Sequence, residues 1–171
     1  AVENNIANIG CPDGGGWVPR GGNPLVTNPF FNILNLKLLR EQYSKQAVQS
    51  FNYKAHQQQM EADYPKEMLY KGRNYNFGNT DYEPYYPFFL WQAFHTRTIY
   101  LPSKQHADGW TTILYTPQGK EICRHTWLAR FYSVPSFIVK HWPPNAGKQT
   151  ARIDTIIDES YALTHKPRPV F

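Results

Sequence analysis

The chain has 171 residues, which is enough for one domain but leaves no room for a second sizeable core. Its formal net charge is +5, yet no cluster of Lys and Arg occurs, which argues against a dedicated nucleic-acid-binding domain. Charged residues are only 18% of the chain, and aromatic residues are 16%. Because protein interfaces lose charge and gain aromatic residues, this composition favours a subunit of a larger assembly. A compact, tyrosine-rich monomer is the alternative.

Residues 1–27 are predicted to form an extended N-terminal arm. Glycines loosen this segment, prolines stiffen it, and scattered apolar residues such as Trp17 provide anchors. Such a segment usually lies along another protein surface, with disorder as the alternative. The glycines at 14–16 lead into Trp17 and not into Lys followed by Ser or Thr, so a phosphate-binding loop is not expected. The chain starts with Ala1 and not with Met, which suggests a processed N-terminus and a removed targeting peptide.

A long amphipathic helix is predicted for residues 28–64. Asn28 can cap it, Pro29 suits the first helical position, and Pro65 ends it. Apolar residues three or four apart form one face of this helix. About 35 helical residues would span about 50 Å, whereas a compact domain of this length has a radius of gyration of about 15 Å. The helix therefore needs a partner protein, unless it breaks near Ser50 into a helical hairpin.

Residues 65–163 are predicted to be a small, aromatic-rich α+β core. Aromatic residues crowd the run from Tyr82 to Tyr100, and two prolines near its start oppose a helix before Phe88. We expect an extended entry, then a short helix or strand from Phe88, and a strand-like piece at 96–101. In one interpretation the run is a hydrophobic core, and in the other part of it faces a partner protein or lipid headgroups.

The strongest strand signal lies between Trp110 and Trp127. Residues 111–116 are rich in β-branched and aromatic side chains, and residues 117–120 have the composition of a turn. Residues 121–127 can then return as an antiparallel strand. The pattern predicts a β hairpin.

Three further predictions complete the fold. Residues 134–142 are a candidate third strand, residues 152–163 have the apolar spacing of a short helix, and residues 164–171 form a proline-containing tail. The predicted fold class is therefore α+β. It has one long N-terminal helix, a small antiparallel β hairpin or three-stranded sheet, a short C-terminal helix, and extended arms at both ends.

Cys123 and His125 are the residues most able to carry chemistry, because residues two apart on a strand share a face. They could bind a metal if Cys11 or His141 came near, or act as a nucleophile and its base. Zinc sites usually show closer ligand pairs in the sequence, and none of the six histidines has such spacing. We therefore expect a buried thiol beside an imidazole, no metal, no cofactor and no enzyme activity. A disulfide between Cys11 and Cys123 is left open.

The arms, the long helix, the aromatic residues and the low charge together resemble supernumerary (accessory) subunits of mitochondrial respiratory-chain or ATP synthase complexes. The resemblance lies in the general style of the whole chain and in no specific motif. It implies a non-catalytic structural subunit of a large mitochondrial inner-membrane assembly, bound at the periphery on either side. Its partners would be other protein subunits, with lipid headgroups as a further contact.

Five aromatic residues are the expected partner-binding anchors: Trp17, Phe30, Phe31, Trp91 and Trp142. Other functions stay open beside this one. A mitochondrial ribosomal protein would place Lys and Arg along rRNA and bind it in a strongly salt-dependent way. A small metal-binding protein or enzyme would use Cys123 and His125, and a viral structural protein would use similar arms.

Overall fold

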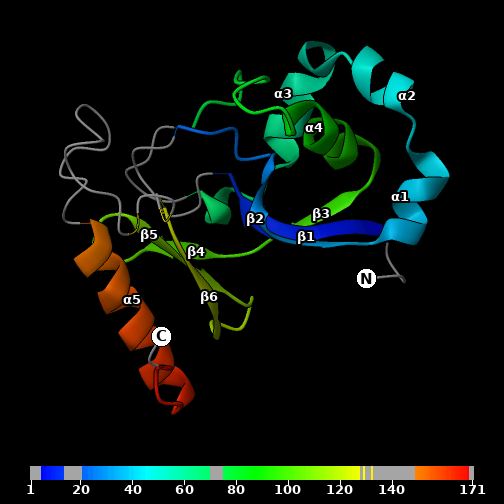
Figure 1. The fold of residues 1–171 in the computed structure, drawn as a ribbon. Coiled ribbons are helices and arrows are strands. Elements are labelled where there is room, and N and C mark those ends of the chain that lie inside the picture. Colours follow the sequence, from blue (N-terminus) through cyan, green and yellow to red (C-terminus); the bar gives the residue numbers. More distant parts are fainter. Residues whose placement is uncertain are drawn as a thin grey trace.

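A computed structural model describes residues 5–13, 21–69, 75–127, 129, 132 and 149–169. Within these residues the chain is an α+β fold with two three-stranded sheets. Figure 1 shows the first sheet beside the central helices and the second sheet beside the C-terminal helix. The α+β class agrees with the composition and patterning of the sequence, but the predicted arrangement of elements does not.

The N-terminal strand is the centre of the first sheet, which has the order β2-β1-β3. β1 (Ile6–Pro12) pairs antiparallel with β2 (Thr27–Leu34) and parallel with β3 (Arg97–Tyr100). β1 is buried along almost its whole length, as expected of a strand that is covered on both faces. The prediction of an extended N-terminal arm is therefore wrong for these residues, which pack inside their own fold.

The single long helix predicted for residues 28–64 is also wrong. The segment forms strand β2, followed by α1 (Leu36–Gln42), α2 (Lys45–Ser50) and α3 (Tyr53–Asp63). One break follows Ser50, as in the hairpin alternative, but another separates α1 from α2. Figure 1 shows the three helices following a curved path around one end of the first sheet.

Local capping and long-range strand pairing explain this difference. Asn35 and Ser44 each accept a hydrogen bond from the third amide of the helix that follows, at 3.2 and 3.0 Å. The backbone is extended at Tyr43 and Phe51, with ψ of 130° and 117°, so each helix stops there. Before Asn35, pairing with β1 holds the chain as a strand, and such tertiary pairing overrides weak helix propensity.

Helix α4 (Tyr86–His95) carries most of the aromatic run and lies in the core. Its Tyr86, Phe89, Leu90 and Trp91 are each at most 6% exposed. The core interpretation therefore holds for the middle of the run, whereas Tyr82 at its start is 53% exposed. The strand expected next is confirmed as β3.

The predicted hairpin is confirmed in the second sheet, which has the order β4-β5-β6. Its strands are β4 (Ser103–Gln105), β5 (Thr111–Tyr115) and β6 (Glu121–Thr126). β4 is the third strand of this sheet, and the candidate third strand at 134–142 lies outside the described residues.

The last helix, α5 (Gln149–Thr164), confirms the predicted C-terminal helix. Beyond it, Arg168 donates hydrogen bonds to Asp154 at 2.6 Å and to Asp158 at 2.9 Å. The segment at Arg168 therefore turns back on α5, which corrects the prediction of an extended C-terminal arm for the described residues. A short 3₁₀ helix, η1 (Lys66–Met68), follows α3.

The two sheets share a hydrophobic cluster. Cys11 of β1, Leu114 of β5 and Leu101 between the sheets are its buried members, and Phe30 and Phe31 pack against it. The described residues contain no helix with the length and apolar character needed to span a bilayer.

Candidate functional site

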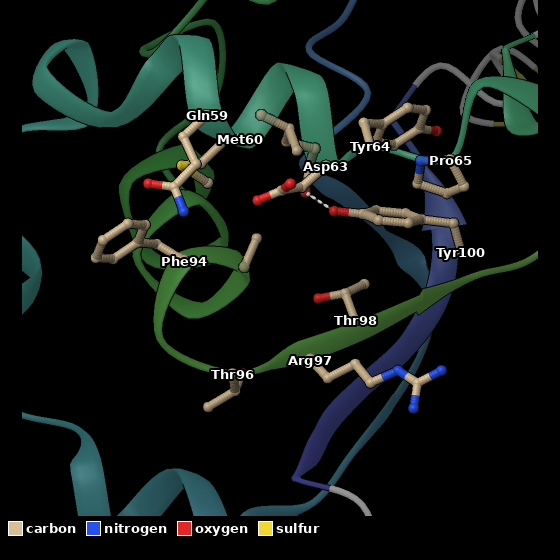
Figure 2. Close-up of a pocket in the computed structure, with 12 residues that line it drawn as sticks. Gln59, Met60, Asp63, Tyr64, Pro65, Phe94, Thr96, Arg97, Thr98 and Tyr100 are labelled. Atoms are coloured by element: carbon tan, nitrogen blue, oxygen red, sulfur yellow. Dashed lines mark hydrogen bonds between the residues drawn. The ribbon is translucent and has the colours of Figure 1, made fainter.

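A cleft of about 400 Å³ lies where α3, α4 and β3 meet (Figure 2). This volume is within the range of small-ligand sites. Its lining includes Gln59, Met60 and Asp63 of α3, Phe94 of α4, and Thr98 and Tyr100 of β3. The cleft combines apolar walls with a few polar groups, which is the usual composition of a binding site.

Two helices end at this cleft. α3 ends at Asp63, because Pro65 follows closely and the residue before a proline avoids helical backbone. α4 ends at His95, and Phe94 and Thr96 on either side of that end line the cleft. The carbonyl groups at a helix C-terminus carry partial negative charge, so both ends favour a nearby cation.

Tyr100 closes the back of the cleft. Its hydroxyl donates a hydrogen bond to the Leu25 carbonyl at 2.9 Å, drawn as the dashed line in Figure 2. Its ring lies 4.8 Å from the Tyr64 ring, measured between centroids. Burial raises the pKa of Tyr100 well above its ordinary value, so the phenol stays protonated and keeps donating this bond.

A buried amide network holds the floor of the cleft. The Gln92 side-chain amide donates to the hydroxyls of Thr96 and Thr98 at 2.8 and 2.9 Å. The Asn8 side chain donates to Gln92 at 3.3 Å and to Thr27 at 2.7 Å. The network joins α4 to all three strands of the first sheet, and the Thr96 and Thr98 hydroxyls of the cleft are already engaged.

Three polar side chains of the cleft make no hydrogen bond or ion pair within the described part of the chain: Gln59, Asp63 and Arg97. Figure 2 shows the Asp63 carboxylate directed into the cleft and the Arg97 guanidinium directed away from Asp63. The Asp63 and Arg97 side chains are both exposed, so a ligand from solvent can reach them. A carboxylate, an amide and a guanidinium at the cleft are therefore open to a ligand.

The five predicted anchor residues lie in different surroundings. Trp91 is 2% exposed and packs in the core of the chain itself. Phe30 and Phe31 are half-buried against the cluster between the sheets. Trp17 and Trp142 lie outside the described residues.

Cys123 and His125 both lie on strand β6, but their surroundings favour a role in packing over a role in chemistry. The His125 ring stacks on Phe30 with a centroid distance of 4.1 Å and an interplanar angle of 4°. Burial, with a smaller contribution from Glu121, raises the pKa of the Cys123 thiol, which opposes formation of a nucleophilic thiolate. Cys123 and Cys11 pack in the same cluster and are not joined by a disulfide. Among the residues described, no three His, Cys, Asp or Glu side chains could hold a metal together.

A second polar centre holds α5 against the second sheet. Arg152 donates hydrogen bonds to the Asp108 carboxylate and to the Trp127 carbonyl, both at 2.8 Å. Further along the helix, the Glu159 carboxylate accepts a hydrogen bond from Arg124 of β6. These groups pair with one another, so their arrangement explains how α5 docks and leaves little to bind a ligand.

The sequence analysis singled out none of the polar cleft residues Gln59, Asp63 and Thr98. One signal was present: Asp63 lies in the last turn of a helix, where Lys or Arg is the favoured type, and α3 has no basic residue in that turn. The meeting of the ends of α3 and α4 was not predictable, because it depends on where the preceding helices break.

Comparison with protein-family models, with curated proteins and with solved structures found no match. The described residues form a small α+β fold with a ligand-sized cleft.

Proposed function

We propose that this chain is a non-catalytic structural accessory subunit that binds other proteins of a large assembly. The assembly we favour is a mitochondrial inner-membrane complex, with the chain at its periphery. The resemblance of the sequence to mitochondrial accessory subunits supports the mitochondrial location. An exposed apolar surface supports the binding of other proteins.

The supporting feature is an apolar surface at the outer edge of the first sheet, here called the β2–α1 surface (Ile33, Leu36 and Tyr43). Ile33 and Leu36 are each 54% exposed and Tyr43 is 48% exposed. Leu36 is the first residue of α1 and Tyr43 directly follows its last residue. The Tyr43 ring meets the Phe88 and Trp91 rings, each at a centroid distance of 6.0 Å, and its remaining surface is exposed. Exposed apolar side chains therefore flank α1 at both of its ends.

The strand beside these residues is open. β2 is the outer strand of its sheet, and no other described strand pairs with its outer edge. Unpaired strand edges are templates for pairing with another chain, and proteins usually protect them with charged side chains. Here exposed Ile33 and Leu36 lie beside the charged and exposed Lys37, Arg40 and Glu41, so the surface combines apolar and charged groups as protein interfaces do.

The mass of the native particle tests the proposal. We expect the chain to migrate with an assembly many times its own mass when mitochondria are gently solubilised. We expect alkaline carbonate to release it from the membrane, as it releases peripheral subunits. Migration as a free chain, or recovery outside mitochondria, would contradict the proposal.

The β2–α1 surface is tested by the double variant Ile33→Thr and Leu36→Gln, which keeps strand and helix propensity. Because both side chains are exposed, each substitution should change the free energy of unfolding by less than about 0.5 kcal/mol. We expect the folded variant to leave the large particle. The control is Leu163→Gln, at a 57% exposed position on α5, and it should stay in the particle. Equal retention of both variants would exclude this surface.

A further inference from the structure

We propose that the cleft between α3, α4 and β3 binds an aliphatic ammonium group, the head of a lysine side chain or of a free alkyl amine. The inference does not depend on the proposed accessory role, because an ammonium group is recognised by the cleft residues alone. It concerns a different face of the molecule from the β2–α1 surface.

The charge at the cleft favours a cation. The Asp63 carboxylate is directed into the cleft and has no partner among the described residues (Figure 2). The C-termini of α3 and α4 add partial negative charge on the same side. A carboxylate in the last turn of a helix is locally unfavourable, and a bound ammonium group would relieve this repulsion.

The end of α3 already holds one ammonium group. The Lys66 Nζ atom donates a hydrogen bond to the Glu61 carbonyl, one of the C-terminal carbonyls of α3. That bond occupies Lys66 at Glu61 and leaves the Asp63 carboxylate open. The end of α3 thus already binds one ammonium group within the chain, and the open Asp63 carboxylate could bind a second one.

Arg97 is the cation among the lining residues, and it does not neutralise the Asp63 carboxylate. The hydroxyls of Thr98 and Tyr100 are bonded to Gln92 and to the Leu25 carbonyl. The Arg97 guanidinium is directed away from Asp63 (Figure 2). Of the open groups, the Asp63 carboxylate accepts hydrogen bonds from ammonium, and the carbonyl oxygen of the Gln59 amide can do the same.

The walls suit an alkyl stem behind the ammonium group. Met60 is 5% exposed, Tyr64 is 3% exposed, and the Phe94 ring borders the same space. Apolar walls of this kind take up methylene groups, and an ammonium group near an aromatic face gains a further attraction. Because the amide network ties α4 to the strands of the first sheet, we expect the cleft to be largely formed before the ligand arrives.

The test is an NMR titration of the whole chain with n-butylammonium, and with butyrate as an anion of similar shape. We expect saturable shifts at Asp63, Phe94 and Thr98 with n-butylammonium at millimolar concentrations, and none with butyrate. In Asp63→Asn we expect binding to weaken at least about tenfold, because a charge-assisted hydrogen bond is lost. Asp63 is exposed, so this variant should remain folded.

The matched control is Glu67→Gln, which removes the same charge from an exposed position that does not line the cleft. It should bind n-butylammonium as the native chain does, whereas Ala93→Leu should block the cleft by filling it. The proposal is overturned if no saturable binding occurs, if butyrate binds equally well, or if Asp63→Asn and Glu67→Gln behave alike.

Two further probes identify the source of the ammonium group. Tighter binding of N-acetyl-lysine methylamide than of n-butylammonium would assign the cleft to a lysine side chain of a partner protein. Tighter binding of cadaverine would assign it to a free amine. Both results support ammonium recognition, and neither depends on whether the chain is found in a large particle.

Discussion

Asp108 receives hydrogen bonds from several directions in the turn before β5. Burial opposes its ionisation, but bonds from Thr111, the Trp110 amide and Arg152 outweigh burial and lower its pKa from 3.8 to about 2. The Thr111 hydroxyl donates to it at 2.6 Å, and Arg152 at 2.8 Å. The Asp108 side chain is 11% exposed, so solvent screens these bonds little.

This pKa predicts how stability depends on pH. Because the folded-state pKa lies below the unfolded value, ionised Asp108 stabilises the fold above about pH 4, and this contribution disappears as the pH falls to about 2. We expect Asp108→Asn to lower the free energy of unfolding by about 2 kcal/mol near neutral pH, with the difference shrinking towards pH 2. Urea unfolding at a series of pH values measures this.

The control for that series is Asp81→Asn, at an exposed position, which should leave the free energy of unfolding nearly unchanged. A difference between Asp108→Asn and the native chain that stayed constant over the whole pH range would contradict the role assigned to ionised Asp108.

At the scale of elements, the β5–β6 hairpin depends on Gly119. The Gly119 amide donates to the Thr116 carbonyl at 2.9 Å, and φ at Gly119 is 82°, a left-handed conformation that glycine adopts without strain. A Cβ atom at this position would meet nothing within 4 Å, so any cost of substitution comes from the backbone alone.

We therefore expect Gly119→Ala to lower the free energy of unfolding by about 1 kcal/mol. Gly119→Asn should cost less, because Asn tolerates left-handed backbone better than Ala. Urea unfolding gives the two values, and hydrogen exchange of the β5 and β6 amides locates the effect. If Gly119→Ala were more stable than Gly119→Asn, the left-handed backbone at Gly119 would not be the cause of the lost stability.

The helices between β2 and α4 show why some elements were mispredicted. The spacing of apolar residues in this segment fits one continuous helix, and that spacing is what a periodicity argument detects. The caps at Asn35 and Ser44 were visible in the sequence, but Asn and Ser also occur on exposed helix faces. Only packing against β1 and α4 decides that the chain must turn at these positions.

At the scale of the whole molecule, the two sheets are joined through Phe30. Phe30 of β2 stacks on His125 and meets the edge of the Trp127 ring at a centroid distance of 6.3 Å. The shared cluster with Cys11 and Leu114 lies beside these rings. The sheets should therefore unfold together, as one cooperative unit.

We expect Phe30→Ala to lower the free energy of unfolding by about 2 kcal/mol, which is below the cost for a fully buried Phe because this ring is half-buried. The protection of the β6 amides against hydrogen exchange should also fall in Phe30→Ala. Ile122→Ala, at a 38% exposed position on β6, is the control and should have a much smaller effect. Loss of stability without any change in β6 would show that Phe30 does not couple the sheets.

Local signals in the sequence were sufficient for three elements: the hairpin at 111–126, the helix at 149–164 and the short strand β3. In each, propensity, turn residues and apolar spacing agree with the final fold, so nearby residues carry the information. The aromatic run is an intermediate case, because its middle is buried whereas Tyr82 at its start is 53% exposed.

The tertiary structure alone decided the rest. β1 pairs with β3, a strand that begins about ninety residues later in the chain, and this pairing turns an apparent arm into the centre of a sheet. Asp63 and Thr98 reach one cleft only after the three helices have broken and α4 has packed on the sheet. A contact between distant parts of a chain costs loop-closure entropy and gains free energy from burial. Neither of these two quantities can be read from a short stretch of sequence.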